Sequence, residues 1–145
     1  EQRAAREAAA QKNAAAEQAR REAENAAKVQ ARRDQALLQT YTSERDIESV
    51  RQRAIADNQR AVEQVEARIA ALKKRQEALA KEAAAAKASG KQRDSYEQDV
   101  KAAAYDLQLQ EQLLESRKRE ADAINARYDE EKRKYRELTQ GAAKK

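Results

Sequence analysis

The sequence predicts an all-α protein, a long antiparallel coiled-coil hairpin with an N-terminal helical extension. Its 145 residues include no proline and only two glycines, so little in the chain interrupts a helix. Alanine, the strongest helix former, accounts for 35 residues, whereas Leu, Val, Ile and Tyr together supply only 23 larger apolar side chains. A compact globule of this length draws on more, and these residues recur instead at the heptad spacing of a coiled coil.

Residues 1–40 are expected to form a charged, Ala-rich helical extension. The only larger apolar side chain within residues 1–36 is Val29, and alanine dominates the rest. Because the second arm of the hairpin should end opposite residue 38, we expect residues 1–36 to have no partner within the chain. The segment would then be either a solvated single helix or an alanine-type coil that awaits a second molecule.

A helix break is expected where the extension meets the hairpin. Thr40, Thr42 and Ser43 are poor residues for a helix interior, because their hydroxyls compete for backbone hydrogen bonds. Ser43, followed three residues later by Asp46, resembles a capping box in which Asp replaces the usual Glu. These residues favour a break or kink near residues 40–43 over one unbroken helix.

Residues 41–140 are expected to form the hairpin. The larger apolar residues of its first arm follow the a and d positions of a heptad. Ile47 and Val50 fall outside this frame, which predicts a local stutter near residues 50–54. Asn58 and Gln76 fill polar gaps in the seam, whose apolar members are Ile55, Val62, Val65, Ile69, Leu72 and Leu79.

Ser89 and Gly90 give the strongest turn signal between the two arms, because serine caps a helix and glycine closes one. When the arms fold back about Gly90, the numbers of facing residues add up to about 179, and large residues face large ones. The second arm should end at Gly141, which leaves residues 141–145 as a C-terminal tail. Its seam is interrupted by Gln110, Arg117 and Glu131. The other seam positions are Tyr96, Val100, Ala103, Leu107, Leu114, Ala121, Ile124, Tyr128, Tyr135 and Leu138.

The absent residue types argue against most chemistry. Without Cys or His, the chain has no thiolate nucleophile, no imidazole base and neither of the commonest zinc ligands. Two isolated glycines cannot build a loop that cradles phosphates. We therefore expect a non-enzymatic protein with no catalytic residue, cofactor, metal or small-molecule substrate. No stretch approaches the ~20 apolar residues of a transmembrane helix.

The net charge of +5 is spread along the chain rather than concentrated. Residues 1–40 and 41–90 each carry an excess of two basic groups, and residues 91–145 an excess of one. A nucleic-acid-binding domain has a clustered basic surface, so binding to nucleic acid is not favoured. Binding to a polyanion, either nucleic acid or an anionic membrane surface, is the alternative function, and a steep loss of binding with salt would support it.

Two groups of apolar residues are candidates for contacts with another molecule. Tyr105, Leu109 and Leu113 form a second stripe beside the main seam, which a two-helix hairpin does not need. Leu37 and Leu38, at the end of the extension, form the other group. We expect the partner to be a second copy of the chain or another helical protein, with incidental exposure of the stripe as the alternative.

Two stretches, RRDQALLQTYTSERDI at residues 32–47 and ARYDEEKRKYREL at residues 126–138, carry a family resemblance. They resemble the helical tails of small, uncharacterised, exported proteobacterial coiled-coil proteins, some of which carry a β-rich module of the DUF4124 type. The resemblance implies a periplasmic or cell-envelope location. It implies no activity, and no functional residue carries over.

The features together predict a structural or interaction protein, either a rigid spacer or a self-associating scaffold. A second alternative to this function is the coiled-coil arm of a larger secreted or toxin protein. Because the sequence begins at Glu1 without a methionine, we expect a fragment or a processed product.

Overall fold

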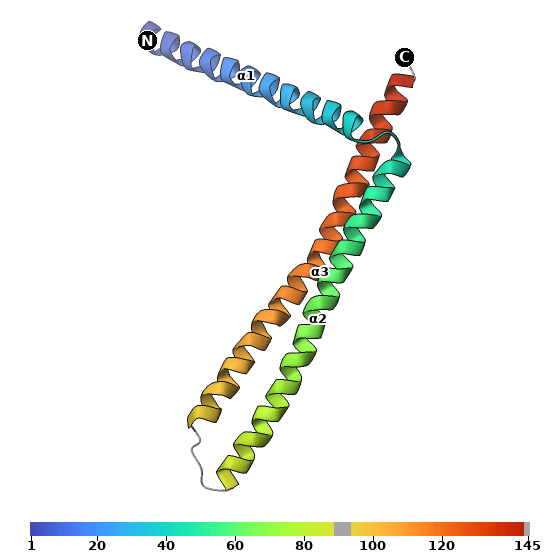
Figure 1. The fold of residues 1–145 in the computed structure, drawn as a ribbon. Coiled ribbons are helices and arrows are strands. Elements are labelled where there is room, and N and C mark those ends of the chain that lie inside the picture. Colours follow the sequence, from blue (N-terminus) through green and yellow to red (C-terminus); the bar gives the residue numbers. More distant parts are fainter. Residues whose placement is uncertain (89–93, 144–145) are drawn as a thin grey trace. The chain divides into compact units, whose positions relative to one another are not determined.

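The computed structural model describes residues 1–88 and 94–143, which form three α-helices and no strand (Figure 1). Helix α1 spans Gln2–Thr40, α2 spans Glu44–Ala88 and α3 spans Asp94–Ala143. The predicted all-α fold is confirmed. The predicted turn residues Ser89 and Gly90 lie outside the described residues.

Contacts divide the chain into two compact units. The first unit combines residues 1–47 with residues 130–145, and the second unit consists of residues 48–129. Helices α2 and α3 contribute to both units. The boundary predicted from the sequence, after residue 40, differs from this division because α3 also contacts the end of α1 in the first unit.

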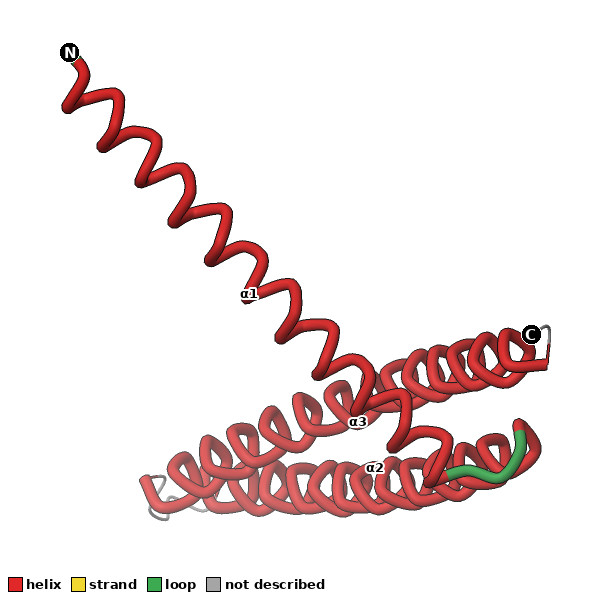
Figure 2. The backbone as a smooth tube through the Cα atoms, turned by 90° about the horizontal axis from the view of Figure 1, so that it is seen from above, coloured by secondary structure: helices red, strands yellow, loops and turns green. Residues whose placement is uncertain are grey.

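In the second unit, α2 and α3 run antiparallel and side by side (Figures 1 and 2). The predicted register describes this pairing well, since Arg51 on α2 contacts Asp129 on α3 and the two numbers add up to 180. All the predicted seam residues of this unit are buried or half-buried. The apolar ones are Ile55, Val62, Val65, Ile69, Leu72, Leu79, Tyr96, Val100, Ala103, Leu107, Leu114, Ala121, Ile124 and Tyr128.

The seam changes frame where the stutter is predicted, but the helix itself is uninterrupted. Residues of two heptad frames contribute to the interface here, since the half-buried positions are Val50, Arg51, Ala54 and Ile55. Before this region the buried position is Ile47, and after it the buried positions follow the predicted heptad. A helix can widen its contact stripe in this way because the two frames differ by one residue, about 100° around the axis.

The predicted break between α1 and α2 is confirmed. Tyr41 has extended backbone angles, φ −117° and ψ 142°, and its N–H donates to the Leu37 carbonyl at 3.2 Å. The Asp46 N–H donates to Ser43 Oγ at 3.1 Å, which is the cap expected from the sequence. The Asp46 carboxylate accepts from the N–H of Thr42 rather than from that of Ser43, so the return half of the capping box is displaced by one residue.

At the other end, α3 continues through Gly141 to Ala143 instead of ending at the glycine. A Cβ at Gly141 would meet no atom within 4 Å, so the surroundings do not require a glycine there. Glycine in a helix costs only about 1 kcal/mol relative to alanine, which the end of a 50-residue helix tolerates.

The most deeply buried large side chain among the described residues is Ile47, with 0% of its surface exposed. We expect Ile47→Ala to lower the free energy of unfolding by about 2–5 kcal/mol, because it leaves a cavity that helices cannot easily close. Urea unfolding followed by circular dichroism measures the change. Val29→Ala, on the exposed face of α1, is the control and should cost less than about 0.5 kcal/mol. Equal effects of the two substitutions would contradict the assigned core.

Candidate interaction surfaces

The acidic run Asp129–Glu131 takes part in separate interactions instead of forming one site. Asp129 Oδ1 accepts from Arg51 Nη2 at 2.6 Å, and Glu131 Oε2 accepts from the Tyr41 hydroxyl at 2.8 Å. Consecutive helical residues point in different directions, which explains why the carboxylates do not converge. In the described part of the chain, no three His, Cys, Asp or Glu side chains are placed to hold a metal ion.

Glu130 and Arg133 form the best-defined charged pair on α3. The hydrogen bond from Arg133 holds the pKa of Glu130 below its ordinary value, and the same bond raises the pKa of Arg133. A lowered carboxyl pKa means that the pair stabilises the helix at neutral pH and is lost as the pH falls through that lowered value. Both side chains are exposed, so the pair is a solvated surface interaction.

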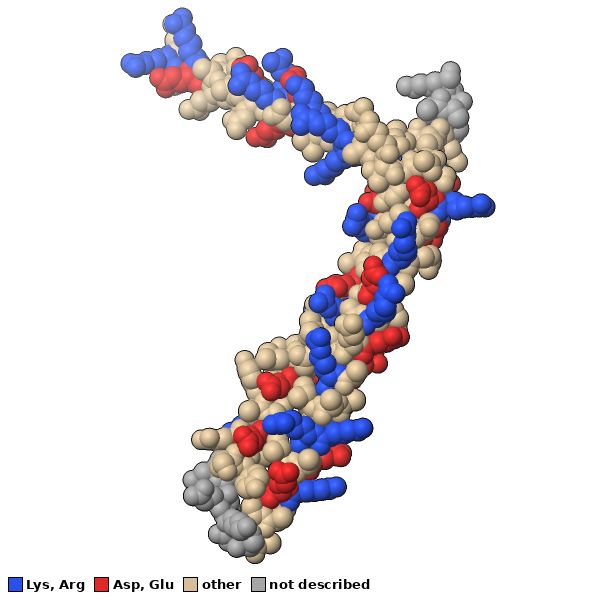
Figure 3. All heavy atoms as spheres, in the orientation of Figure 1, with Lys and Arg blue, Asp and Glu red and all other residues tan. Residues whose placement is uncertain are grey.

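Charges of both signs alternate over the face of the molecule drawn in Figure 3. Lys and Arg side chains are accompanied by Asp and Glu on the same helices, as in the pairs Arg21–Glu17 and Arg119–Glu115, each at 3.1 Å. The basic run at residues 132–134 follows this rule, because Arg133 also pairs with Glu137 at 3.0 Å. On the face drawn, the described basic side chains do not gather into one surface of the kind that binds phosphates.

The first unit holds a polar cluster where the break meets α3. Tyr41 is 6% exposed, and its ring is buried while its hydroxyl donates to Glu131. Arg136 Nε donates to Glu44 Oε1 at 2.8 Å, which ties the start of α2 to α3. An aromatic ring and two charge-assisted hydrogen bonds therefore hold the extended segment in place.

The expectation that residues 1–36 have no partner in the chain is wrong at Asp34. Its carboxylate lies 4.0 Å from Lys134 Nζ, and both side chains are largely shielded. Leu37, one turn later, is half-buried. The break at Tyr41 gives the last turns of α1 a neighbour in the first unit. This contact is made by a charged pair outside the straight hairpin register, so neither the count of apolar residues nor that register predicts it.

The polar residues of the seam differ in burial and in hydrogen bonding. Asn58 is buried and its Nδ2 donates to the Arg117 carbonyl at 2.9 Å, a bond from α2 to α3. The Arg117 guanidinium turns out of the seam to Glu120 at 3.0 Å, so only its stem is buried. Gln110 is half-buried, and its Oε1 is shielded from solvent without a hydrogen-bond partner.

The predicted interaction residues divide into exposed and sheltered members. Tyr105 is 61% exposed and Leu109 is 43% exposed, whereas Leu113 is half-buried. At the other candidate surface Leu38 is exposed, but Leu37 is half-buried within the first unit. Among the described residues of the second unit, Tyr105 and Leu109 are thus the exposed large apolar residues.

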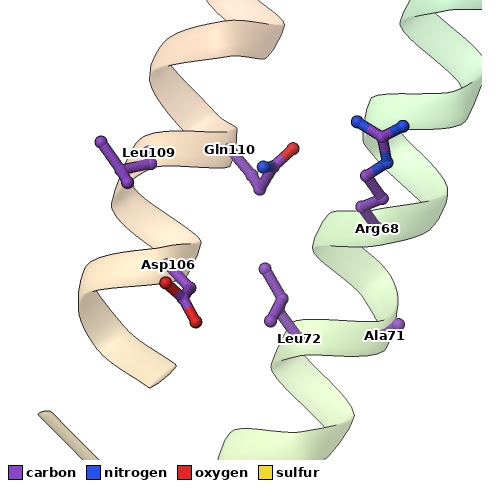
Figure 4. Close-up of a pocket in the computed structure, with 6 residues that line it drawn as sticks. All are labelled: Arg68, Ala71, Leu72, Asp106, Leu109 and Gln110. Carbon is purple, nitrogen blue, oxygen red and sulfur yellow. The ribbon is translucent and has the colours of Figure 1, made fainter. Parts of the chain in front are cut away.

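A groove of about 360 Å³ runs between α2 and α3 beside this stripe (Figure 4). Leu72 and Gln110 point into the space between the helices, and Leu109 points outward from α3. The rims of the groove are the g and c positions of the heptads that flank the seam, which the composition and the a and d positions do not reveal. Its lining consists of Arg68, Ala71, Leu72, Asp106, Leu109 and Gln110.

No protein-family model, curated protein or solved structure matches this chain. None of the described helices contains a segment long and apolar enough to cross a membrane.

We predict that Tyr41→Phe lowers the free energy of unfolding by about 1.5–3 kcal/mol, because it removes a hydrogen bond to a charged, partly buried acceptor. Urea unfolding of Tyr41→Phe, Glu131→Gln and the double variant forms a cycle that isolates the pair from the other interactions of Glu131. Tyr128→Phe, a buried seam tyrosine, is the control and should change stability little. Additive effects of the two substitutions would show that the pair is not coupled.

We predict that Asn58→Leu raises the free energy of unfolding by about 1–2 kcal/mol but weakens the register of the hairpin. A buried polar seam residue costs stability and specifies alignment, and the Arg117 carbonyl keeps its own position in α3 when the amide is lost. Urea unfolding measures the first effect.

Cysteine cross-linking measures the effect of Asn58→Leu on register. Val65→Cys with Leu114→Cys reports the native alignment, and Val65→Cys with Ala121→Cys reports a shift of one heptad. The shifted cross-link should form only when Asn58 is replaced. Gln76→Leu, at a half-buried polar seam position, is the matched control. An unchanged cross-linking pattern would mean that Asn58 does not set the register.

Proposed function

We propose that this chain is a non-enzymatic structural and interaction protein that acts as a rigid helical spacer and scaffold. The observation that carries the proposal is the antiparallel pairing of two helices, 45 and 50 residues long, with a heptad seam filled along the second unit. Such pairing stiffens each helix against bending, which a single solvated helix cannot do over the same length.

The distribution of chemical groups supports a geometric role. The described carboxylates are dispersed along the helix surfaces, several of them in ion pairs with arginine or lysine, and the polar seam residues are spread over the length of the hairpin. A scaffold needs surfaces that bind other helices, and the exposed stripe at Tyr105 and Leu109 is one. The partners we propose are another helical protein or a second copy of the chain.

The location we propose is the bacterial cell envelope. The support is the resemblance of residues 32–47 and 126–138 to exported proteobacterial proteins. Fusion of alkaline phosphatase to the product of the complete gene, which is active only after export, tests this location. An inactive fusion beside an active exported control would contradict it.

We predict that two spin labels, one near each end of the part of α2 that lies in the second unit, report one fixed distance. The chain has no cysteine of its own, so Ser49→Cys and Lys87→Cys, both exposed, give two unique labels. For a straight helix the separation is about 57 Å, from 1.5 Å per residue. Double electron–electron resonance should therefore give a narrow distribution near this distance.

Dilution of the labelled chain with unlabelled chain restricts the measurement to distances within one molecule. Ala67→Pro is the control, because Ala67 is exposed and proline there breaks the helix without removing a seam side chain. It should shorten and broaden the distribution. A broad distribution in the unmodified sequence would overturn the spacer proposal.

A further inference from the structure

We propose that α1 of a second copy of this chain pairs antiparallel with α1, so that the two N-terminal helices join two hairpins into one dimer. No residue of α1 is buried within the chain, so its faces are open to a partner. The inference rests on the proposed scaffold function and assigns the partner and the mode of binding. The surface is the α1 seam, the line of residues at the a and d positions of a heptad: Ala5, Ala8, Lys12, Ala15, Ala19, Glu22, Ala26, Val29 and Arg33.

The apolar members of the α1 seam are small, which allows another helix to come close. Five of the nine residues are alanine, and the largest apolar one is Val29, which is 43% exposed. Helices that meet through such residues approach to about 8 Å, the short end of the usual range. A partner with equally small seam residues fits this face, and α1 of a second copy is such a helix. Val29 lies near one end of the seam, where alanine would keep a pair of the same small kind.

The charged members of the α1 seam select a second copy as the partner. In an antiparallel coiled coil an a position faces a d position, so the numbers of facing residues have a constant sum. A sum of 34 makes Lys12 of each copy face Glu22 of the other, and a two-fold axis perpendicular to the helices forms this match twice. The same sum makes every other seam residue face a compatible one: Ala5 faces Val29, Ala8 faces Ala26, Ala15 faces Ala19 and Arg33 faces Glu1.

The neighbouring registers and the parallel orientation lack this match. With a sum of 27 or 41, Lys12 would face Ala15 or Val29, and its charge would lose solvent without gaining a partner. In a parallel pair without a shift, Lys12 would lie beside Lys12 of the second copy, and Glu22 beside Glu22. Like charges at one height repel each other. The order of charges along α1 therefore favours the antiparallel pair with a sum of 34.

The seam charges have no ionic partner within the described chain. The ion pair Arg21–Glu17, at 3.1 Å, joins a c and an f position, which point away from the seam. Lys12 and Glu22 form no ion pair with another described residue. Glu22 accepts only a long hydrogen bond from Gln18, at 3.5 Å. Both seam charges are exposed and so are available to a second molecule.

The residues beside the α1 seam are compatible with the pairing. The contact between α1 and α3 is at Asp34, five residues beyond Val29, so pairing through the seam does not compete with the packing of the first unit. Between residues 9 and 25 the e and g positions carry no charge, so no like charges meet along the flanks. One flank consists of Ala9, Ala16 and Ala23, and the other of Gln11, Gln18 and Asn25.

Charge reversal tests the assembly, with mass measured by size exclusion coupled to light scattering. The unmodified chain should have twice its 16.4 kDa mass. K12E and E22K should each weaken self-association by about tenfold or more, because the two-fold interface then contains two repulsive pairs. An equimolar mixture of K12E and E22K should associate again, since both pairs across the interface become attractive.

Two further variants separate this contact from other effects. K28E makes the same charge change as K12E at an exposed c position, and it should leave self-association unchanged. The double variant K12E/E22K should form a dimer. Residues 12 and 22 are about 15 Å apart along one helix, too far to pair within it, so its recovery reports a contact between copies. Circular dichroism should show equal helicity in all variants, because Lys and Glu have similar helix propensities.

A spin label tests the orientation of the two helices. Ala31→Cys provides a single label at an exposed f position in a chain without cysteine, so every measured distance is between copies. In the antiparallel pair residue 31 of one copy faces residue 3 of the other, which separates the labels by about 42 Å along the axis. Double electron–electron resonance should give this distance. A short distance would indicate parallel helices and overturn the inference.

A monomeric unmodified chain would overturn the proposed pairing, as would equal weakening by K12E and K28E or a double variant that stays monomeric. These outcomes leave the spacer function intact as long as the spin-label distance in α2 remains narrow. A broad α2 distance in a chain that still dimerises through α1 would overturn the spacer function and leave the pairing intact.

Discussion

The single line of side chains between α2 and α3 is the interaction on which the rest of the structure depends. With 23 larger apolar residues in 145, the chain cannot build a layered core, and each helix can bury only one stripe. Two helices that share one stripe must run alongside each other over many turns to bury enough of it. The length of α2 and α3 follows from this scarcity, and so does the exposure of nearly everything else.

Among the described residues, the break between α1 and α2 is where the chain leaves helical geometry. Tyr41 leaves helical geometry and places its ring in the core of the first unit, where the hydroxyl meets Glu131. Ile47, the first buried residue of α2, lies in the same unit. Apolar burial and charge-assisted hydrogen bonds thus reinforce each other at the junction, whereas elsewhere the ion pairs are mainly exposed and contribute little.

The sequence predicted what depends on periodicity and on local capping. The α2 and α3 seams, their register and the break before Ser43 all follow from patterns of period seven and from side chains that compete with the helix backbone. The contact of Asp34 with Lys134 depends on the direction that the chain takes after Tyr41, and a linear register cannot supply this direction. Gly141 shows the opposite error, because a residue that can end a helix does not have to end it when the preceding 47 residues already form one.

The same reasoning explains why the exposed stripe was predictable and the groove beside it was not. Tyr105 and Leu109 are large, and their spacing reveals a face, whereas Ala71 contributes to the groove by being small. In a chain with 35 alanines, the sequence alone does not indicate that Ala71 lines a groove. That role becomes visible only when Ala71 and Leu109 are seen to line the same groove.

Helix α1 illustrates the other use of alanine. None of its 39 residues is buried, so its helicity comes from intrinsic propensity and from pairs such as Arg21–Glu17. A helix of this length and composition is well beyond the 12–15 residues at which isolated helices are marginal. Most of its length therefore needs no packing partner to stay helical, and only its last turns contact α3, where Asp34 lies 4.0 Å from Lys134. The alanines of α1 stabilise the helix that contains them, whereas Ala71 lines the groove between α2 and α3.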